Sequence, residues 1–199
     1  WGEWVPQATR GEPYDVLHNG DAIDGVHHHS TTQISQNFQD QLRIARLVLA
    51  PIVAACQASG GTYYHIRGTQ AHVGQSGVYE EMLAEQLGAK PNADGQYARY
   101  DLWKRVGSVL VHAMHHIGTT SSASHESSAV NAELTAEYVE AARWQREPPD
   151  FVVRSHRHRS IAVDLTARKV WLGKNGVYFY ANLDDPRGCL FADLPAGSM

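Results

Sequence analysis

Short apolar stretches alternate with amphipathic segments along the first half of this chain, and this alternation limits the fold more than any other feature. Residues 14–21 (YDVLHNGD) and 60–68 (GGTYYHIRG) are apolar runs bounded by glycine, a pattern that predicts β-strands. Residues 32–58 and 76–89 have helical periodicity. Strands that alternate with helices in this way are typical of α/β proteins.

The second half of the chain is richer in strand patterns. Residues 97–106 and 108–118 predict two strands joined by a turn at Gly107, and residues 127–147 predict a helix that ends before two prolines. Residues 151–156 and 160–183 predict further strands, the last with a turn at Asn175–Gly176. We therefore expect an α/β fold with a mixed sheet or two packed sheets.

The composition fits one globular domain over residues 1–199, with 43% hydrophobic and 19% charged residues. No apolar run approaches the roughly 18–20 residues that a membrane span requires. A net charge of −4 without a run of Lys or Arg argues against a long track for nucleic acid. Cys56 and Cys189 form no metal-ligand or redox motif, so we expect a reducing compartment, the cytoplasm.

Twelve histidines are the unusual feature of the composition, and they cluster at or beyond the ends of apolar stretches. In residues 151–160 (FVVRSHRHRS), His156 and His158 stand two positions apart, so both rings point to one side if the strand continues. Two imidazoles that face one point suit a metal ion. The alternative for an isolated H-x-H is a pair of exposed loop histidines.

Three further strand ends carry residues that can bind metals. Asp21 lies in GDAID (residues 20–24), on a turn where its carboxylate can bridge two cations or simply cap the next turn. Thr69 and His72 lie in GTQAH (residues 68–72), and His115–His116 follow the strand of residues 108–118. The ordered set of four strand ends is more specific than any single motif.

This ordered set resembles the calcineurin-like metallophosphoesterase superfamily, over roughly residues 14–160, with a likeness to its phage and prophage-type members. The family's motifs run D-x-H, G-D-x-x-D, G-N-H followed by an acid, a strand-end His, and G-H-x-H. Here GDAID, GTQAH, His115–His116 and SHRH (residues 155–158) stand at the last four, and no D-x-H triplet is present. Because the chain also opens like the end of a helix (WGEWVPQATRG), we expect the first strand and its motif to lie upstream.

The resemblance implies an α/β fold of mixed β-sheets packed as a sandwich and flanked by helices. It also implies two divalent ions, Mn, Fe or Zn, and a role for each matching residue. Asp21 would bridge the ions, Thr69 would stand where the family has its ligand Asn, and His72 would be the catalytic or phosphate-contacting histidine. The metal-binding histidines would be His156, His158 and either His115 or His116. Arginines beside the motifs are candidates to hold phosphate: Arg67 and Arg157 first, with Arg154 and Arg159.

The implied activity is hydrolysis of phosphate mono- or diesters by a hydroxide that two metals activate. Nucleotides and DNA ends are candidate substrates, a homo-oligomer is compatible with the sequence, and a membrane partner is not expected. An inactive metal-binding remnant is the alternative, because D-x-H is missing. A single-metal barrel hydrolase also uses H-x-H, but it needs about 250 residues. His27–His29 either line the rim of the site or form a polar approach to the next helix. We expect His18, His65 and His112 to pack within the sheet.

Overall fold

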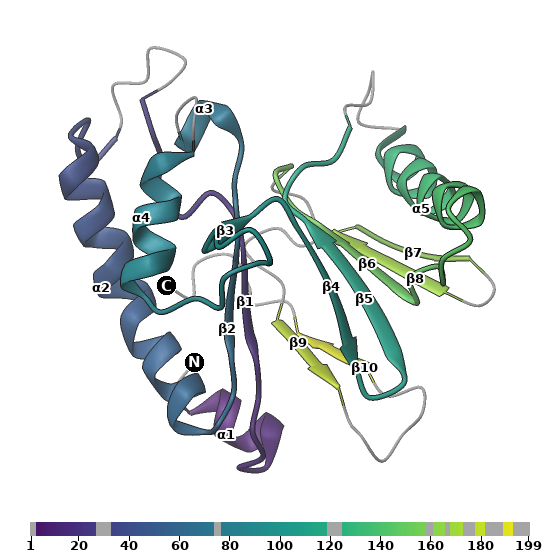
Figure 1. Cartoon of the computed structure of the whole chain (residues 1–199), viewed down its shortest axis with the longest axis horizontal. Coiled ribbons are helices and arrows are strands. Elements are labelled where there is room, and N and C mark those ends of the chain that lie inside the picture. Colours follow the sequence, from purple (N-terminus) through teal and green to yellow (C-terminus); the bar gives the residue numbers. More distant parts are fainter. Residues whose placement is uncertain are drawn as a thin grey trace. The chain divides into compact units, whose positions relative to one another are not determined.

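The computed structural model describes residues 3–26, 33–73, 77–118, 125–157, 161–165, 168–172, 178–181 and 189–192 (Figure 1). The chain divides into two compact units, Trp1–Tyr100 and Asp101–Met199. Among the described residues, the first unit has one sheet and four helices and the second has two sheets and one helix, and each unit is described by itself. The division into two compact units does not test the prediction of one domain over residues 1–199, which stays a prediction.

The first unit is a parallel sheet covered by helices (Figure 1). Its strands are β1 (Val16–Asn19), β2 (Tyr63–Ile66) and β3 (Ala98–Arg99), in the order β1-β2-β3 and parallel throughout. The pairing of β1 with β2 runs from Val16↔Tyr63 to Asn19↔Ile66. Its helices are α1 (Trp4–Thr9), α2 (Phe38–Ala58), α3 (Gln70–Val73) and α4 (Val78–Gln86).

Helix α2 begins six residues later than its periodicity predicts. Asn37 has an extended backbone, and its side chain accepts a hydrogen bond from Gln39 N at 2.8 Å, so the cap fixes the start at Phe38. Pro51 lies inside the helix, as predicted. By length and composition alone α2 could cross a membrane, but its buried residues, among them Leu42 and Val53, join the core of the first unit. A helix that covers a sheet passes the same test, so this signal is weak.

The core of the first unit lies where α2 and α4 meet the sheet. Its buried residues come from both helices, from β2 and β3 and from the turn after β1: Ile23, Leu42, Ala45, Val53, Tyr63, Leu83, Ala84, Leu87, Ala89 and Ala98. The predicted helix at residues 76–89 is present as α4, and Gly88, at φ 69°, follows its end as a stop. Ser76, the predicted start signal, lies outside the described residues.

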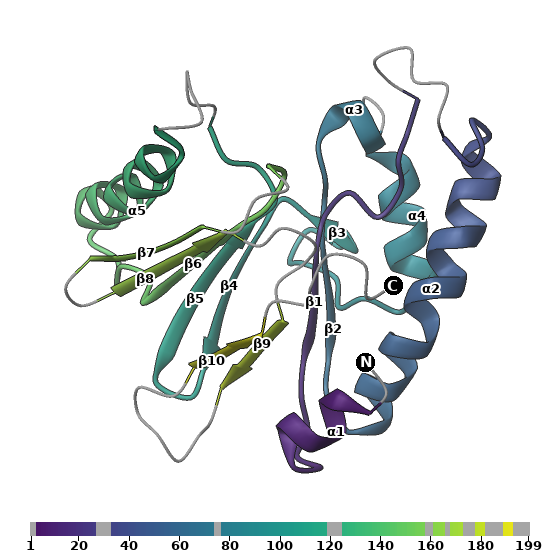
Figure 2. The same ribbon diagram turned by 180° about the vertical axis from the view of Figure 1, so that it is seen from behind.

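The second unit contains a mixed five-stranded sheet and one long helix (Figure 2). The strand order is β4 (Asp101–Val106), β5 (Val109–Met114), β6 (Phe151–Arg154), β8 (Arg168–Leu172) and β7 (Ile161–Leu165). β5, β6 and β8 are parallel, and the edge strands β4 and β7 pair antiparallel. α5 (Glu126–Arg143) packs Val130 and Leu134 against Val152. β9 (Tyr178–Ala181) and β10 (Cys189–Ala192) form a separate antiparallel pair.

The predicted α/β class, with mixed sheets flanked by helices, is confirmed. Stacking of the sheets as a sandwich stays a prediction. The parallel pairs β1–β2 and β5–β6 position the candidate residues, because the carboxyl ends of parallel strands meet at one edge of a sheet. Those ends carry four of the motifs that the sequence singles out.

Candidate metal-binding residues

Asp21 lies on a turn that leaves the end of β1 in an unusual backbone conformation. Gly20 has a φ of 82° and Asp21 a φ of 57°, both in the left-handed region. Glycine adopts this conformation freely, and aspartate is one of the few other residues that tolerate it. The turn therefore carries the Asp21 carboxylate beyond the end of β1, beside the turn that follows β2.

The turn after β2 comes into direct contact with the Asp21 turn. Thr69 N donates a hydrogen bond to Asp21 Oδ1 at 2.8 Å, and Thr69 Oγ1 lies 3.4 Å from the same oxygen. Gly68 permits this approach, because a Cβ at that position would lie 2.0 Å from Asp21 Oδ1 and 2.4 Å from Asp21 N. The two turns predicted to share a site are thus neighbours in the first unit.

His72, on α3, completes this group. Its Nδ1 lies 2.7 Å from the carbonyl oxygen of Asp24, so Nδ1 carries the proton and donates. Nε2 then presents a lone pair, 3.7 Å from Asp21 Oδ2. A backbone carbonyl on one ring nitrogen is the usual way of fixing the tautomer of a metal-binding histidine. Nε2 of His72 thus faces the Asp21 carboxylate, where it can either bind a cation through its lone pair or, when protonated, donate a proton, but not both at once.

The second unit brings together the histidines of the other two motifs. His115 follows β5 and His156 follows the adjacent strand β6, with ring centroids 5.5 Å apart. The His116 ring lies 5.2 Å from the His156 ring, so the geometry keeps both His115 and His116 as candidates. Ser155 N donates to the carbonyl of His115 at 2.9 Å, which ties the two strand ends together.

His156 has a left-handed backbone, with a φ of 74°. A residue with a Cβ pays a conformational penalty there of about 1–2 kcal/mol. Such outliers cluster at functional sites, where the surrounding structure holds a side chain in a required direction. His158, the second histidine of the motif, and the rim candidates His27–His29 lie outside the described residues.

The arginines beside the motifs occupy different surroundings. Arg67 lies over the Tyr100 ring at 4.6 Å and donates to its hydroxyl at 3.0 Å, with Glu81 4.0 Å away. Arg157 is half-buried in the turn after His156. Both stay predictions as phosphate contacts. Arg154 is not available for that role, because its guanidinium is 1% exposed and paired with two glutamates of α5.

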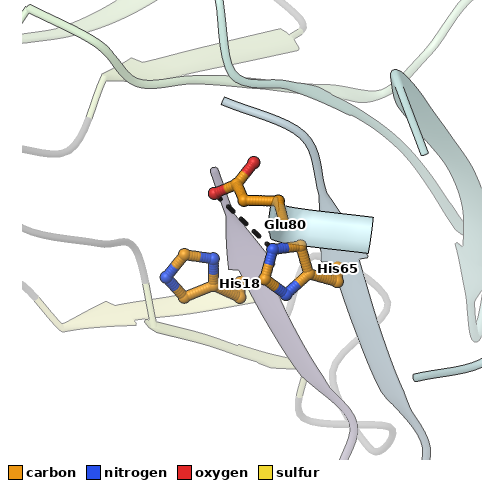
Figure 3. A group of neighbouring side chains, drawn as sticks. All are labelled: His18, His65 and Glu80. Atoms are coloured by element: carbon orange, nitrogen blue, oxygen red, sulfur yellow. Dashed lines mark ion pairs between the residues drawn. The ribbon is translucent and has the colours of Figure 1, made fainter. Parts of the chain in front are cut away.

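Glu80, on α4, is a site residue that the sequence reasoning missed. Its side chain is fully buried, and its carboxylate accepts hydrogen bonds from Ala22 N at 2.7 Å and from Gly68 N. His65 Nε2 lies 3.6 Å from Glu80 Oε1, and the His18 ring stacks on His65 at 4.8 Å (Figure 3). Early glutamates are ordinary in the first turn of a helix, so no local signal distinguishes Glu80.

The pKa of Glu80 lies below its ordinary value. Burial would raise it, but the nearby His65 ring, the charge of His18 and the Gly68 N–H together outweigh burial. The carboxylate is therefore ionised at neutral pH. The Tyr63 hydroxyl lies 2.7 Å from His65 Nδ1, and burial raises the pKa of Tyr63, so the phenol keeps its proton. His65 thus links a buried phenol to a buried carboxylate.

His18, His65 and Glu80 could be considered as a metal site of their own, since their ligand atoms all lie within 4.8 Å of one another. The two imidazole planes are only 24° apart and stacked. Because imidazole lone pairs lie in the ring plane, stacked rings do not direct them at one ion. The cluster instead serves as a buried polar network, in agreement with the expectation that His18 and His65 pack within the sheet.

His112 also packs within its sheet, as predicted. Its ring stacks on Trp103 at 4.1 Å, and its Nδ1 lies 2.8 Å from Glu137 Oε1 on α5. Glu137 in turn pairs with Arg154 at 2.8 Å. The pKa of Glu137 lies below its ordinary value, because His112 and Arg154 outweigh the effect of burial. This network anchors the end of β6 immediately before Ser155 and His156.

The chain has a weak structural similarity to solved Vps29 structures, with TM-scores of 0.33–0.35. A Vps29 from Cryptosporidium parvum has 12% identity and a TM-score of 0.35, and the match covers 79% of this chain and 72% of that one. A zinc-complexed wild-type Vps29 from Entamoeba histolytica has 14% identity and a TM-score of 0.33, with the same coverage. A single mutant of the latter has 13% identity and a TM-score of 0.33, with 80% and 72% covered.

Likeness of this degree assigns neither a family nor a function. No protein-family model matches the chain, and no curated protein matches it.

Proposed function

We propose that this chain carries the site of a metal-dependent phosphoester hydrolase of the calcineurin-like type that its motifs resemble. The group of Asp21, Thr69 and His72 supports this proposal most strongly. Two parallel strand ends bring a carboxylate, a hydroxyl and a tautomer-fixed imidazole together in the first unit. Asp21 and Thr69 offer the oxygen donors that a hard or borderline divalent cation binds, and His72 lies beside them as the proton donor.

The proposal assigns the chemistry to the residues as follows. Asp21 would bridge two divalent ions, and the histidines after β5 and β6 would complete the ligand set, with His158. When bound, the ions would supply Lewis-acid charge for the phosphoryl oxygens and lower the pKa of a shared water. His72 presents Nε2 toward this region, where as an imidazolium it can give a proton to the leaving oxygen. The carbonyl of Asp24 holds the ring in that orientation.

Further parts of the proposal concern the context of the reaction. The substrate would be a phosphate mono- or diester, with nucleotides and DNA ends included, and Arg67 and Arg157 would contact its phosphate. We also propose a cytoplasmic protein related to phage-type members of the superfamily, with Mn, Fe or Zn as the metal.

The second candidate function is a metal-binding module without hydrolase activity. Two observations favour it: the 199 residues contain no D-x-H triplet, and Thr69 offers a hydroxyl where the resembled family has a carboxamide. A hydroxyl is a weaker neutral ligand. Both candidates predict metal binding, so only an activity measurement separates them.

The test is hydrolysis of bis-p-nitrophenyl phosphate and p-nitrophenyl phosphate with added Mn²⁺. It compares the wild type with Asp21→Asn, both in this chain and in a form extended upstream. Asp94→Asn is the charge-matched control, since Asp94 lies in an exposed loop of the same unit. We expect activity that Asp21→Asn reduces at least 100-fold and Asp94→Asn leaves unchanged. If neither form of the chain hydrolyses the substrates although each is folded and binds metal, the metal-binding module is favoured.

Metal stoichiometry provides a separate test of the two-metal part. The proposal requires Asp21 and the histidines of the second unit to contribute to one pair of ions. Asp21→Asn and His156→Gln should therefore each lower the bound Mn²⁺ from two equivalents toward one or none, measured after dialysis by elemental analysis. Two equivalents retained in either variant would contradict it.

A further inference from the structure

We infer that Glu80 is a positioning residue, whose carboxylate holds the Asp21 turn and the Thr69 turn together by a hydrogen bond to the backbone of each. This inference rests on the proposed function for the role of the two turns, but its structural part does not. Glu80 is outside every motif that the sequence offers. It belongs to α4, and its buried carboxylate reaches the backbone of both turns at once.

The backbone hydrogen bonds show why such a residue is needed. The pairing of β1 with β2 ends at Asn19↔Ile66, and the two chains then separate into their turns. Ala22, which follows Asp21, and Gly68, which precedes Thr69, have N–H groups beyond that last pair. Both donate to Glu80, one to each oxygen. The carboxylate acts as one more rung of the ladder, built from a side chain instead of a strand.

The separation of the Asp21 turn from the Thr69 turn is therefore set by the two oxygens of one carboxylate. Thr69 N is then in place to donate to Asp21 Oδ1 at 2.8 Å, and Gly68 lies too close to Asp21 for any Cβ. A shift of either turn would move the Asp21 carboxylate relative to the Thr69 hydroxyl. Since ligand bonds tolerate only a few tenths of an ångström, such a shift weakens metal binding.

Only a carboxylate can make this connection. Both of its oxygens accept, whereas the amide of glutamine has one acceptor and one donor of the same size. In Glu80→Gln, one of the two backbone N–H groups would face an NH₂ group and lose its partner. His65, at 3.6 Å, faces the same carboxylate and offsets the cost of burying it.

The next residue on α4 provides a matched control. Glu81 also accepts from two consecutive backbone N–H groups, those of Tyr97 at 2.7 Å and Ala98 at 2.8 Å. These belong to the segment that enters β3, away from the Asp21 and Thr69 turns. Glu81→Gln thus removes the same kind of double hydrogen bond from the same helix. Its carboxylate also lies 4.0 Å from Arg67, but the Ala22 and Gly68 amides donate to Glu80 instead.

The experiment combines amide hydrogen exchange with Mn²⁺ titration of the whole chain. In Glu80→Gln we expect protection of the Ala22 and Gly68 amides to fall at least tenfold more than global stability explains. We expect the Kd for Mn²⁺ to rise about 10–100-fold, the usual effect of losing an outer-shell partner. Glu81→Gln should expose the Tyr97 and Ala98 amides and change the Kd less than twofold.

Two outcomes would overturn the inference: unchanged protection of Ala22 and Gly68 in Glu80→Gln, or an equal loss of Mn²⁺ affinity in both variants. If Glu80→Gln does not fold, Glu80→Asp keeps the charge with a shorter reach and should lose protection at one of the two amides. A wild type that binds none of Mn²⁺, Fe²⁺ and Zn²⁺ would refute the proposed function alone, because the exchange data are read in the absence of metal.

Discussion

Arg154 allows the sharpest test of the structure, because a charged residue with 1% exposure must be paired to remain buried. Its Nε donates to Glu133 Oε2 at 3.0 Å, one terminal nitrogen donates to Glu137 Oε1 at 2.8 Å, and the other donates to the carbonyl of Val153 at 2.9 Å. Replacement by methionine keeps most of the volume and removes every donor. The perturbation therefore isolates the charge.

The expected loss of stability follows from what remains after the substitution. Glu133 is 28% exposed and can be hydrated, but Glu137 is 12% exposed and would keep only His112 at 2.8 Å and Arg146 at 3.9 Å. Each hydrogen bond to a charged group contributes about 1.5–3 kcal/mol. Breaking a buried pair by removing one partner costs roughly 3–5 kcal/mol. We expect Arg154→Met to lower the free energy of unfolding by that amount.

Urea unfolding followed by circular dichroism measures this loss. Arg143→Met is the control, since Arg143 lies 70% exposed in a surface pair with Glu140 and such pairs contribute about 0–1 kcal/mol. In a double-mutant cycle, Arg154→Met with Glu137→Gln should cost about 1–3 kcal/mol less than the sum of the single variants, because the buried Glu137 carboxylate is no longer left without Arg154. A loss below about 1 kcal/mol for Arg154→Met, or strict additivity, would refute the reasoning.

Three further predictions concern the two strand-end regions. Gly68→Ala should weaken Mn²⁺ binding at least tenfold, because its Cβ would lie 2.0 Å from Asp21 Oδ1. In the control Gly61→Ala, the new Cβ meets the Tyr14 carbonyl at the other end of β2, so the fold should lose stability while Mn²⁺ affinity stays the same. Equal Mn²⁺ affinities in the two variants would contradict this prediction. His156→Gly should be about 1 kcal/mol more stable than His156→Ala in thermal unfolding, because φ is 74°, and the reverse order would count against the left-handed backbone. The pKa of Glu137 is lowered in the folded state, so its carboxylate stabilises the fold at pH values above the ordinary pKa of 4.5, and this contribution is lost as pH falls through the folded-state pKa. Glu137→Gln should therefore flatten the decline of stability in acid. An unchanged slope of stability against pH would exclude this contribution of Glu137.

Much of the fold could be predicted from short-range signals in the sequence. Apolar runs that stop at Asn19–Gly20, at Gly68 and before Ser155 mark strand ends, because turn residues act within a few positions of where they stand. The metal-binding candidates follow those ends, so their approximate location could also be predicted. The start of α2 could not be predicted in this way. The helical periodicity extends upstream of Asn37, but the helix itself begins only at the Asn37 cap.

The roles of individual charged residues required the tertiary structure. Arg154 and Arg157 look alike in SHRH and its flank, yet one is buried under α5 and the other is not. Glu80 and Glu81 are adjacent in a helix, yet they bind different backbone segments, 58 and 16 residues away in sequence. The ends of a strand and the position of a turn are marked by residues nearby in the chain, whereas the partner of a charge depends on which distant element packs against it.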